Sequence, residues 1–112
     1  NCPLTKETKG LMSEKRLKLM MPDAYIINTS RSEIIDEKAL FDLLKNNKIA
    51  GAGLDVFRRQ ENGNSKLLEA PNTILIPHLG SATIEGRIEM GEKVIVNIKT
   101  FIDGHNPPNR II

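Results

Sequence analysis

Residues 25–57, YIINTSRSEIIDEKALFDLLKNNKIAGAGLDVF, contain two apolar runs with a helical pattern between them. The first run, residues 25–27, and the second, residues 48–57, are short and apolar, as buried parallel strands are. Between them, Asp36 is a good helix N-cap, and one face of the following helix is apolar. The residues of that face are Leu40, Leu43 and Leu44. The stretch therefore predicts a strand, a helix and a second strand parallel to the first, joined by a right-handed crossover.

The same alternation continues on both sides of this stretch. Residues 5–21 predict a turn and then an amphipathic helix, which the following proline ends. Residues 71–78, PNTILIPH, predict a third short strand, and a long helix is expected from Ser81 to about Gly104. The fold class is therefore α/β, with about three parallel strands and flanking helices.

The start of the chain suggests a piece of a larger molecule. It begins NCPLT, without an initiating methionine, and a sheet of about three parallel strands is narrow. We therefore expect the 112 residues to be part of a longer protein whose sheet continues. The bared edge of the strand near residues 25–28 would then favour self-association.

Composition restricts the classes of function. Sixteen Lys and Arg residues stand against fourteen Asp and Glu residues, and the charge of +2 is spread along the chain. Nucleic-acid-binding proteins usually have a concentrated basic stripe instead. The single cysteine, Cys2, allows no internal disulfide, and no run of about 18 apolar residues indicates a membrane span. We expect a cytoplasmic protein that binds neither nucleic acid nor membrane.

The polar residues that follow each apolar run are the candidates for chemistry, because open parallel α/β sheets bind ligands beyond the carboxyl ends of their strands. These residues are Arg31, Asp55 and His78. Arginine holds a carboxylate or carbonyl with a planar fork, and histidine exchanges protons near neutral pH. Together they suit a small anionic substrate. By position alone, such an arginine is more often a solvated loop residue and such a histidine a strand cap.

Two glycines give a weaker signal. Gly51 and Gly53 lie inside a strand pattern and not between a strand and a helix. This placement favours close helix-to-sheet packing over phosphate binding. The leucines and methionines of the helical patterns are assigned to the core.

Four motifs, CPLTKETKGLM, INTSRSEIIDEKAL, IAGAGLDVF and PNTILIPHLGSAT, follow one another in the chain. In order and spacing they closely resemble the cofactor domain of the D-isomer-specific 2-hydroxyacid dehydrogenases, and the resemblance covers nearly the whole chain. It implies the C-terminal half of a Rossmann-type doubly wound parallel sheet, with residues 1–112 as a partial NAD(P)-binding domain. Residues 81–112 would include the long helix and tail that lead back to a substrate domain outside this chain.

The resemblance also implies a reaction, hydride transfer between NAD or NADP and a D-2-hydroxy acid or its 2-keto acid. Arg31 matches the family arginine that orients the substrate carboxylate and polarises its carbonyl. His78 matches the acid/base that protonates the carbonyl oxygen, and Asp55 the aspartate that holds the nicotinamide carboxamide. The segments that line the cofactor are matched by Cys2, Pro3, Thr29, Ser30, Arg31, Asp55, His78, Gly80 and Ser81. No metal is implied.

The chain departs from the family pattern in two places. Ser32 replaces a glycine, which puts a Cβ where close backbone approach is usual. The family's catalytic glutamate falls five residues after the aspartate, where this chain has Gln60, with Glu61 next. A carboxylate beside an imidazole favours its protonated form, whereas an amide orients the ring without charge. Our interpretation is that Gln60 takes the glutamate's catalytic place, as in the formate dehydrogenases; the alternative is that Glu61 reaches His78.

The C-terminal tail PPNRII favours the glyoxylate and hydroxypyruvate reductase branch of the family, with phosphoglycerate dehydrogenases next. The glycine-rich phosphate loop and the residue that separates NAD from NADP are not among these residues. We therefore expect the parent protein, a homodimer, to be the enzyme and the 112-residue chain alone to be inactive. Two other readings stay open: a cofactor-sensing binding module like the C-terminal-binding-protein corepressors, and a remnant without function.

Overall fold

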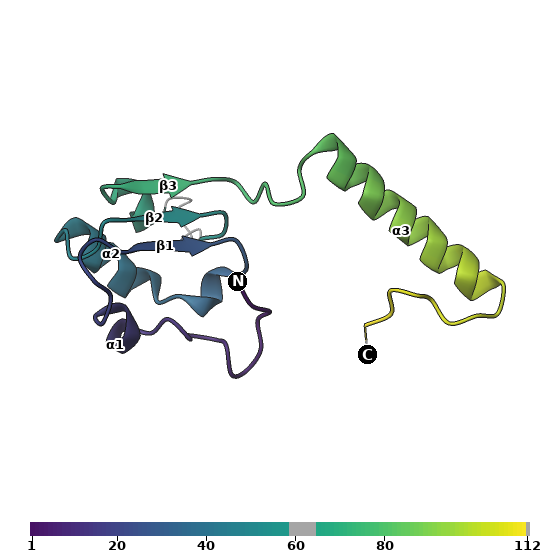
Figure 1. Ribbon diagram of the computed structural model, residues 1–112, viewed down its shortest axis with the longest axis horizontal. Helices are drawn as coiled ribbons and strands as arrows, with labels where there is room; N and C mark the ends of the chain where they lie inside the picture. Colours follow the sequence, from purple (N-terminus) through teal and green to yellow (C-terminus); the bar gives the residue numbers. More distant parts are fainter. Residues whose placement is uncertain (59–64, 112) are drawn as a thin grey trace. The chain divides into compact units, whose positions relative to one another are not determined.

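The computed structural model describes residues 1–58 and 65–111. It divides into two compact units, residues 1–78 and residues 79–112, which are described separately. The first unit contains the sheet and the second contains one long helix (Figure 1).

The sheet has three parallel strands in the order β1-β2-β3, which confirms the predicted parallel α/β architecture. The strands are β1 Tyr25–Asn28, β2 Gly51–Leu54 and β3 Thr73–Leu75. Tyr25 pairs with Gly51, and Gly53 pairs with Ile74. Because all three strands run in one direction, their carboxyl ends meet at one edge of the sheet (Figure 1).

One face of the sheet is covered by α1 Glu14–Leu17 and α2 Glu37–Lys45 (Figure 1). Two short 3₁₀ helices, η1 Ser32–Ile34 and η2 Lys66–Glu69, lie in the connections. The predicted cap is confirmed, because the Asp36 side chain accepts a hydrogen bond from the Ala39 N–H at 3.1 Å. The core comprises Leu17, Ile26, Ile34, Ile35, Ala39, Leu40, Leu44, Ile49, Ala52, Leu54 and Leu67.

The helix predicted after a turn within residues 5–21 is much shorter than expected, since only Glu14–Leu17 of this range is α-helical. The backbone just before it is engaged elsewhere. The Met12 N–H donates to the Ile34 carbonyl at 2.9 Å, and the Met12 carbonyl accepts from the Asp36 N–H at 3.0 Å. This short parallel bridge to the residues before α2 competes with helix formation, and Gly10, at φ +67°, turns the chain ahead of it. Met21, expected in the core, is exposed.

The strand predicted to be buried on both faces has one exposed face. Tyr25 is 70% exposed and Ile27 is 67% exposed, and Ile74, in β3 of the same sheet, is 71% exposed. Within the described residues β1 is also an edge strand. The sequence of an apolar strand cannot distinguish one covered face from two, and here Ile26 and Asn28 are the buried pair.

Gly51 and Gly53 allow close packing, as predicted. The atoms packed against them belong to β1 and to the turn before β3, whereas the prediction was a helix. A Cβ on Gly51 would lie 2.6 Å from the Asn72 carbonyl oxygen and about 3.1 Å from the Tyr25 ring. A Cβ on Gly53 would lie 3.0 Å from the end of Ile27. The small residues of β2 therefore make room for β1 side chains and for the turn that enters β3.

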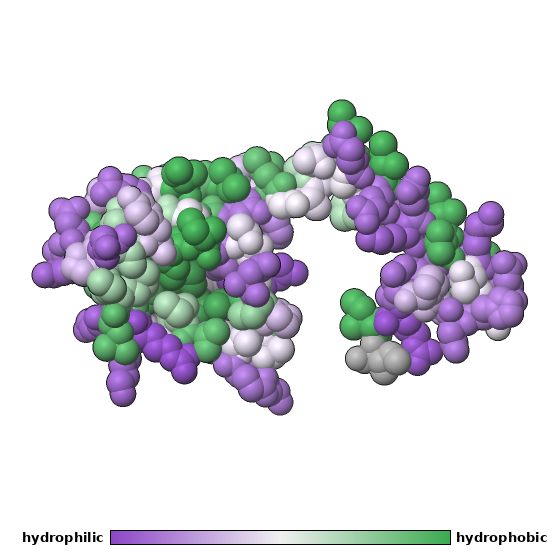
Figure 2. Space-filling view, in the orientation of Figure 1, coloured by the Kyte–Doolittle hydropathy of each residue, from purple (hydrophilic) through white to green (hydrophobic). Residues whose placement is uncertain are grey.

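The second unit contains α3 Ile84–Ile102, which begins three residues later than predicted. The Thr83 side chain caps its first turn by accepting from the Gly86 N–H at 3.0 Å, and Gly104, at φ +79°, follows its end. No residue of α3 is buried, and apolar side chains lie along it (Figure 2). In the described part of the chain, no helix combines the length and apolarity that a membrane crossing requires.

Candidate active site

The three residues predicted from the strand ends line one cleft. Arg31 follows β1, Asp55 follows β2 and His78 follows β3, and all border a cleft of about 380 Å³. The other lining residues are Ser32, Glu33, Val56, Phe57, Ile76 and Pro77. The cleft offers a guanidinium, a carboxylate and an imidazole to one small molecule, which is the arrangement expected at the carboxyl edge of an open parallel sheet.

The turn after β1 carries Arg31 and is held by a buried amide. Asn28 is 5% exposed; its Oδ1 accepts from the Ser30 N–H at 3.0 Å, and its Nδ2 donates to the Arg31 carbonyl at 2.9 Å. The Arg31 Nη1 donates to the Ser30 carbonyl at 2.8 Å. Side chain and backbone therefore fix the same three-residue turn, which the sequence pattern alone had treated only as the end of a strand.

The turn after β3 carries His78 and is built differently. The His78 N–H donates to the Ile76 carbonyl at 3.0 Å, which closes a tight turn around Pro77. His78 has φ +58°, in the left-handed region that non-glycine residues seldom adopt. Its side chain is exposed. Such backbone outliers are often found at functional sites, where surrounding structure maintains them.

Asp55 follows β2 and is hydrogen-bonded to the end of β1. It is only 3% exposed, and its N–H donates to the Asn28 carbonyl at 2.9 Å. The Asp55 backbone is thus held at the edge of the cleft by a hydrogen bond that continues the ladder between β1 and β2.

Glu33 was not predicted as a site residue, yet it lines the cleft with Arg31. Its own N–H and the Ser32 hydroxyl donate to its carboxylate and hold its pKa below the ordinary value of 4.5; Arg58 and Arg31 contribute in the same direction. A search limited to the first charged residue after each strand misses it. Its position two residues after Arg31, within the same connection, is the signal that would have found it.

A second hollow adjoins the cleft. It has a volume of about 460 Å³, and its lining comprises Asn1, Cys2, Pro3, Leu4, Ser30 and Arg31. The Ser30 hydroxyl donates to the Cys2 carbonyl, which joins the start of the chain to the turn after β1. Cys2, Pro3 and Ser30, predicted to line the cofactor, thus lie together beside Arg31. Thr29 is exposed in the same turn.

The structure does not test the placement of four predicted residues. Gly80 and Ser81 belong to the second unit, which is described by itself. Gln60 and Glu61 lie outside the described residues.

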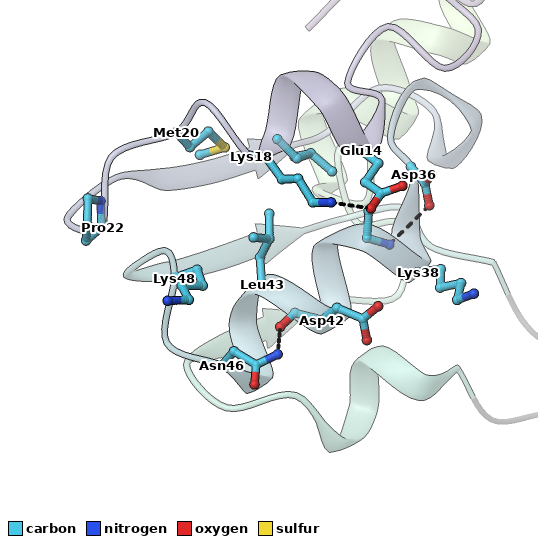
Figure 3. Close-up of a pocket in the computed structure, with 12 residues that line it drawn as sticks. Glu14, Lys18, Met20, Pro22, Asp36, Lys38, Asp42, Leu43, Asn46 and Lys48 are labelled. Carbon is cyan, nitrogen blue, oxygen red and sulfur yellow. Dashed lines mark hydrogen bonds and ion pairs between the residues drawn. The ribbon is translucent and has the colours of Figure 1, made fainter.

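A larger hollow, of about 780 Å³, lies between α1 and α2 (Figure 3). Its polar groups are largely engaged locally: Lys18 pairs with Glu14 at 2.6 Å, and Asn46 donates to the Asp42 carbonyl at 2.7 Å. It is not lined by any of the strand-end residues. Among residues 1–58 and 65–111, no three His, Cys, Asp or Glu side chains gather as they would around a metal ion. The smaller cleft therefore remains the candidate site.

Curated proteins and solved structures that are similar to this chain were found. Among curated proteins, the chain is 50% identical over 109 residues to a glyoxylate reductase of Thermococcus litoralis, covering 97% of this chain and 33% of that protein. A glyoxylate reductase of Pyrococcus furiosus is 47% identical, with 97% and 32% covered. The chain thus spans about a third of the length of the curated relatives that it matches.

Solved structures are also similar to this chain in fold and sequence. An acyclic imino acid reductase in complex with NADPH and D-Arg has a TM-score of 0.91 and 35% identity, covering all of this chain and 36% of that one. The NADPH-dependent glyoxylate/hydroxypyruvate reductase of Sinorhizobium meliloti, in complex with NADP and malonate, has a TM-score of 0.79 and 38% identity, with 88% and 31% covered. Residues 1–80 match the family model for the NAD binding domain of D-isomer specific 2-hydroxyacid dehydrogenases, and the chain belongs to this family.

Proposed function

We propose that the protein carrying this chain is an NAD(P)-dependent 2-hydroxyacid dehydrogenase that reduces small 2-keto acids such as glyoxylate or hydroxypyruvate. The observation that carries the proposal is the single cleft that Arg31, Asp55 and His78 share, each from a different strand end. The glyoxylate reductases of Thermococcus and Pyrococcus support the choice of substrate class.

The residues present fit the nicotinamide end of a dinucleotide. The hollow beside Cys2, Pro3 and Ser30 adjoins the cleft through Arg31, and Asp55 is a buried carboxylate that would accept from the carboxamide. Thr29, Gly80 and Ser81 are proposed to complete this lining. When bound, the cofactor would supply the hydride.

Arg31 and His78 are assigned the remaining roles. The guanidinium of Arg31 would hold the substrate carboxylate through paired N–H donors and polarise the neighbouring carbonyl. The imidazole of His78 would donate a proton to the carbonyl oxygen during reduction and take it back during oxidation. The exposure of His78 leaves its ring accessible to a molecule in the cleft.

Gln60 is proposed as the partner that orients His78, with Glu61 as the alternative. The segment that carries both starts after Arg58, whose N–H donates to Glu37 Oε1 of α2 at 2.8 Å. It ends at Ser65, which is buried and caps η2 through the Leu67 N–H at 3.2 Å. Activity of Gln60→Ala and Glu61→Ala decides between them: if only the Glu61 change abolishes activity, the Gln60 assignment is wrong.

The same proposal extends to the organisation of the parent protein. Residues 1–112 would form part of the NAD(P)-binding domain, and residues 81–112 would lead to the substrate domain. We also propose that the parent protein is a homodimer and is cytoplasmic. Only the resemblance to the family supports these two points.

The test is an assay of NAD(P)H oxidation with glyoxylate and with hydroxypyruvate, using the full-length product of the reading frame that contains these residues. We expect turnover by that product and none by the isolated 112-residue chain. Absence of turnover by the full-length product, with both cofactors and both acids, would refute the proposed function.

A further inference from the structure

We propose that Asn28 is a positioning residue that holds Arg31 in the geometry required to bind the substrate carboxylate. The inference rests on the proposed function, because it names the residue through which Arg31 acts. Asn28 itself does not line the cleft; the residues at the cleft begin with Arg31.

Both ends of the Asn28 amide are used, and both act on the same turn. The oxygen accepts from the Ser30 N–H, and the nitrogen donates to the Arg31 carbonyl, at 3.0 and 2.9 Å. The side chain is 5% exposed, and Ser30 is 8% exposed. Buried hydrogen bonds of this kind are costly to break, because the group left behind loses its partner without gaining water.

The turn held by Asn28 is also the anchor of the Arg31 side chain. The guanidinium donates to the Ser30 carbonyl at 2.8 Å, so that its direction depends on the Ser30–Arg31 peptide. Bidentate recognition of a carboxylate requires a fixed planar fork. A shift of about 1 Å at such a group costs about 100-fold in rate. A change at Asn28 should therefore weaken substrate binding more than cofactor binding.

Asn28→Asp is the sharpest variant, since it keeps the size and the acceptor for the Ser30 N–H. It replaces the donor with a carboxylate oxygen that faces the Arg31 carbonyl oxygen. The matched control is Asn46→Asp, because the Asn46 Nδ2 also donates to a backbone carbonyl, that of Asp42, but on the exposed end of α2. If Asn28→Asp proves unfolded by circular dichroism, Asn28→Ser replaces it, since a hydroxyl closes the same turn more weakly.

In the full-length product, we expect Asn28→Asp to raise the KM for glyoxylate about tenfold or more, and to raise the KM for NAD(P)H by a smaller factor, because Ser30 and Arg31 also line the hollow proposed for the cofactor. Asn46→Asp should change neither. In an Arg31→Lys background the effect of Asn28→Asp should largely vanish, because the group that it positions is already lost. Equal effects in both backgrounds, or a parallel rise of both KM values, would assign Asn28 a merely structural role and overturn the inference.

A second measurement separates this inference from the proposed function. In the full-length product, ¹⁵N relaxation reports the order of the Arg31 backbone N–H directly. We expect Asn28→Asp, and not Asn46→Asp, to lower that order. If wild-type full-length protein shows no keto-acid reduction, the proposed function fails while the Asn28 contact is judged by this experiment alone. An unchanged Arg31 order in Asn28→Asp overturns the positioning role regardless of activity.

Discussion

The turns that follow β1 and β3 carry the two side chains assigned to substrate chemistry, and they are stabilised in opposite ways. The turn with Arg31 is tied by a buried amide that bonds to the backbone on both sides. The turn with His78 is exposed and is closed by a tight backbone hydrogen bond from His78 to Ile76, with His78 itself in the left-handed region. A carboxylate anchor must be rigid, whereas an acid/base needs reach and the correct protonation state. Under the proposed function, the substrate would be held from the β1 side and the proton transferred from the β3 side.

Removing the imidazole should give the largest effect. Asn tolerates the left-handed conformation of position 78, so His78→Asn removes the acid/base with little change to the turn. We expect kcat for glyoxylate reduction by the full-length product to fall about 10²–10⁴-fold, with cofactor binding retained. A kcat within tenfold of wild type would remove His78 from the mechanism. Cofactor binding followed by NAD(P)H fluorescence serves as the control.

Changing the anchor should act on binding more than on chemistry. Arg31→Lys keeps the charge but loses the planar fork. Since a hydrogen bond to a charged group contributes about 1.5–3 kcal/mol, kcat/KM for glyoxylate should fall about 10–150-fold, mainly through KM. Steady-state kinetics of the full-length product measure this. A kcat/KM equal to that of wild type would show that the anchor lies elsewhere in the cleft.

The two turns should also differ in stability. Asn28→Ala leaves the Ser30 N–H and the Arg31 carbonyl without their side-chain partner, and we expect the free energy of unfolding to fall by about 1–3 kcal/mol. Urea denaturation of the 112-residue chain measures it. An unchanged midpoint would mean that water or other groups replace the amide and that the first turn is not locked by Asn28.

Removing the side chain of His78, in the turn after β3, should change the free energy of unfolding by less and in the opposite direction. His78→Gly relieves the left-handed strain, which costs about 1–2 kcal/mol for an L-residue, but adds about 0.5–1 kcal/mol of backbone entropy. We therefore expect a gain of up to about 1.5 kcal/mol in the free energy of unfolding, measured by urea denaturation. A loss of stability would show that the His78 side chain makes contacts that hold the turn.

The smallest expected effect concerns the stability contribution of Glu37 in α2, which accepts a hydrogen bond from Arg58 in the connection after β2. Burial raises the pKa of Glu37 above 4.5, although the Arg58 N–H and charge act against this. The folded chain then binds the proton more tightly than the unfolded one, so this group's contribution to stability falls as the pH rises from 4.5 through the raised pKa. Glu37→Gln keeps an acceptor for Arg58 and does not titrate. It should be more stable than wild type at about pH 7 and equal to it at about pH 4. A difference that is independent of pH would contradict this account.

The features that were predicted from sequence depend on local patterns and on the geometry of parallel sheets. The strand–helix–strand order, the Asp36 cap and the meeting of Arg31, Asp55 and His78 follow from short apolar runs and from strands that share a direction. The errors arise where distant segments compete. The first helix is short because the Met12 backbone pairs with residues near Ile34 and Asp36, a contact that no local pattern records.

The rest of the site could not be predicted for related reasons. Asn28 is the last residue of a strand and carries no motif of its own; its role depends on burial and on the two ends of one amide. Glu33 does not directly follow a strand pattern; it comes two residues after Arg31. Its lowered pKa results from hydrogen bonds with its own N–H and with the Ser32 hydroxyl. The exposed face at Tyr25 and Ile27 depends on which elements cover the sheet, which an apolar run does not specify.

The division of roles between the two turns is tested most directly by the pH dependence of kcat/KM for glyoxylate reduction by the full-length product, its Arg31→Lys variant and its His78→Asn variant. Histidine is the side chain that ordinarily changes charge between about pH 5 and 8. The account predicts that wild type and Arg31→Lys lose activity in parallel as the pH rises, because reduction consumes a proton that His78 supplies, with Arg31→Lys lower throughout, and that His78→Asn shows no such loss. A pH-dependent loss that persists in His78→Asn, or one that disappears in Arg31→Lys, would contradict it.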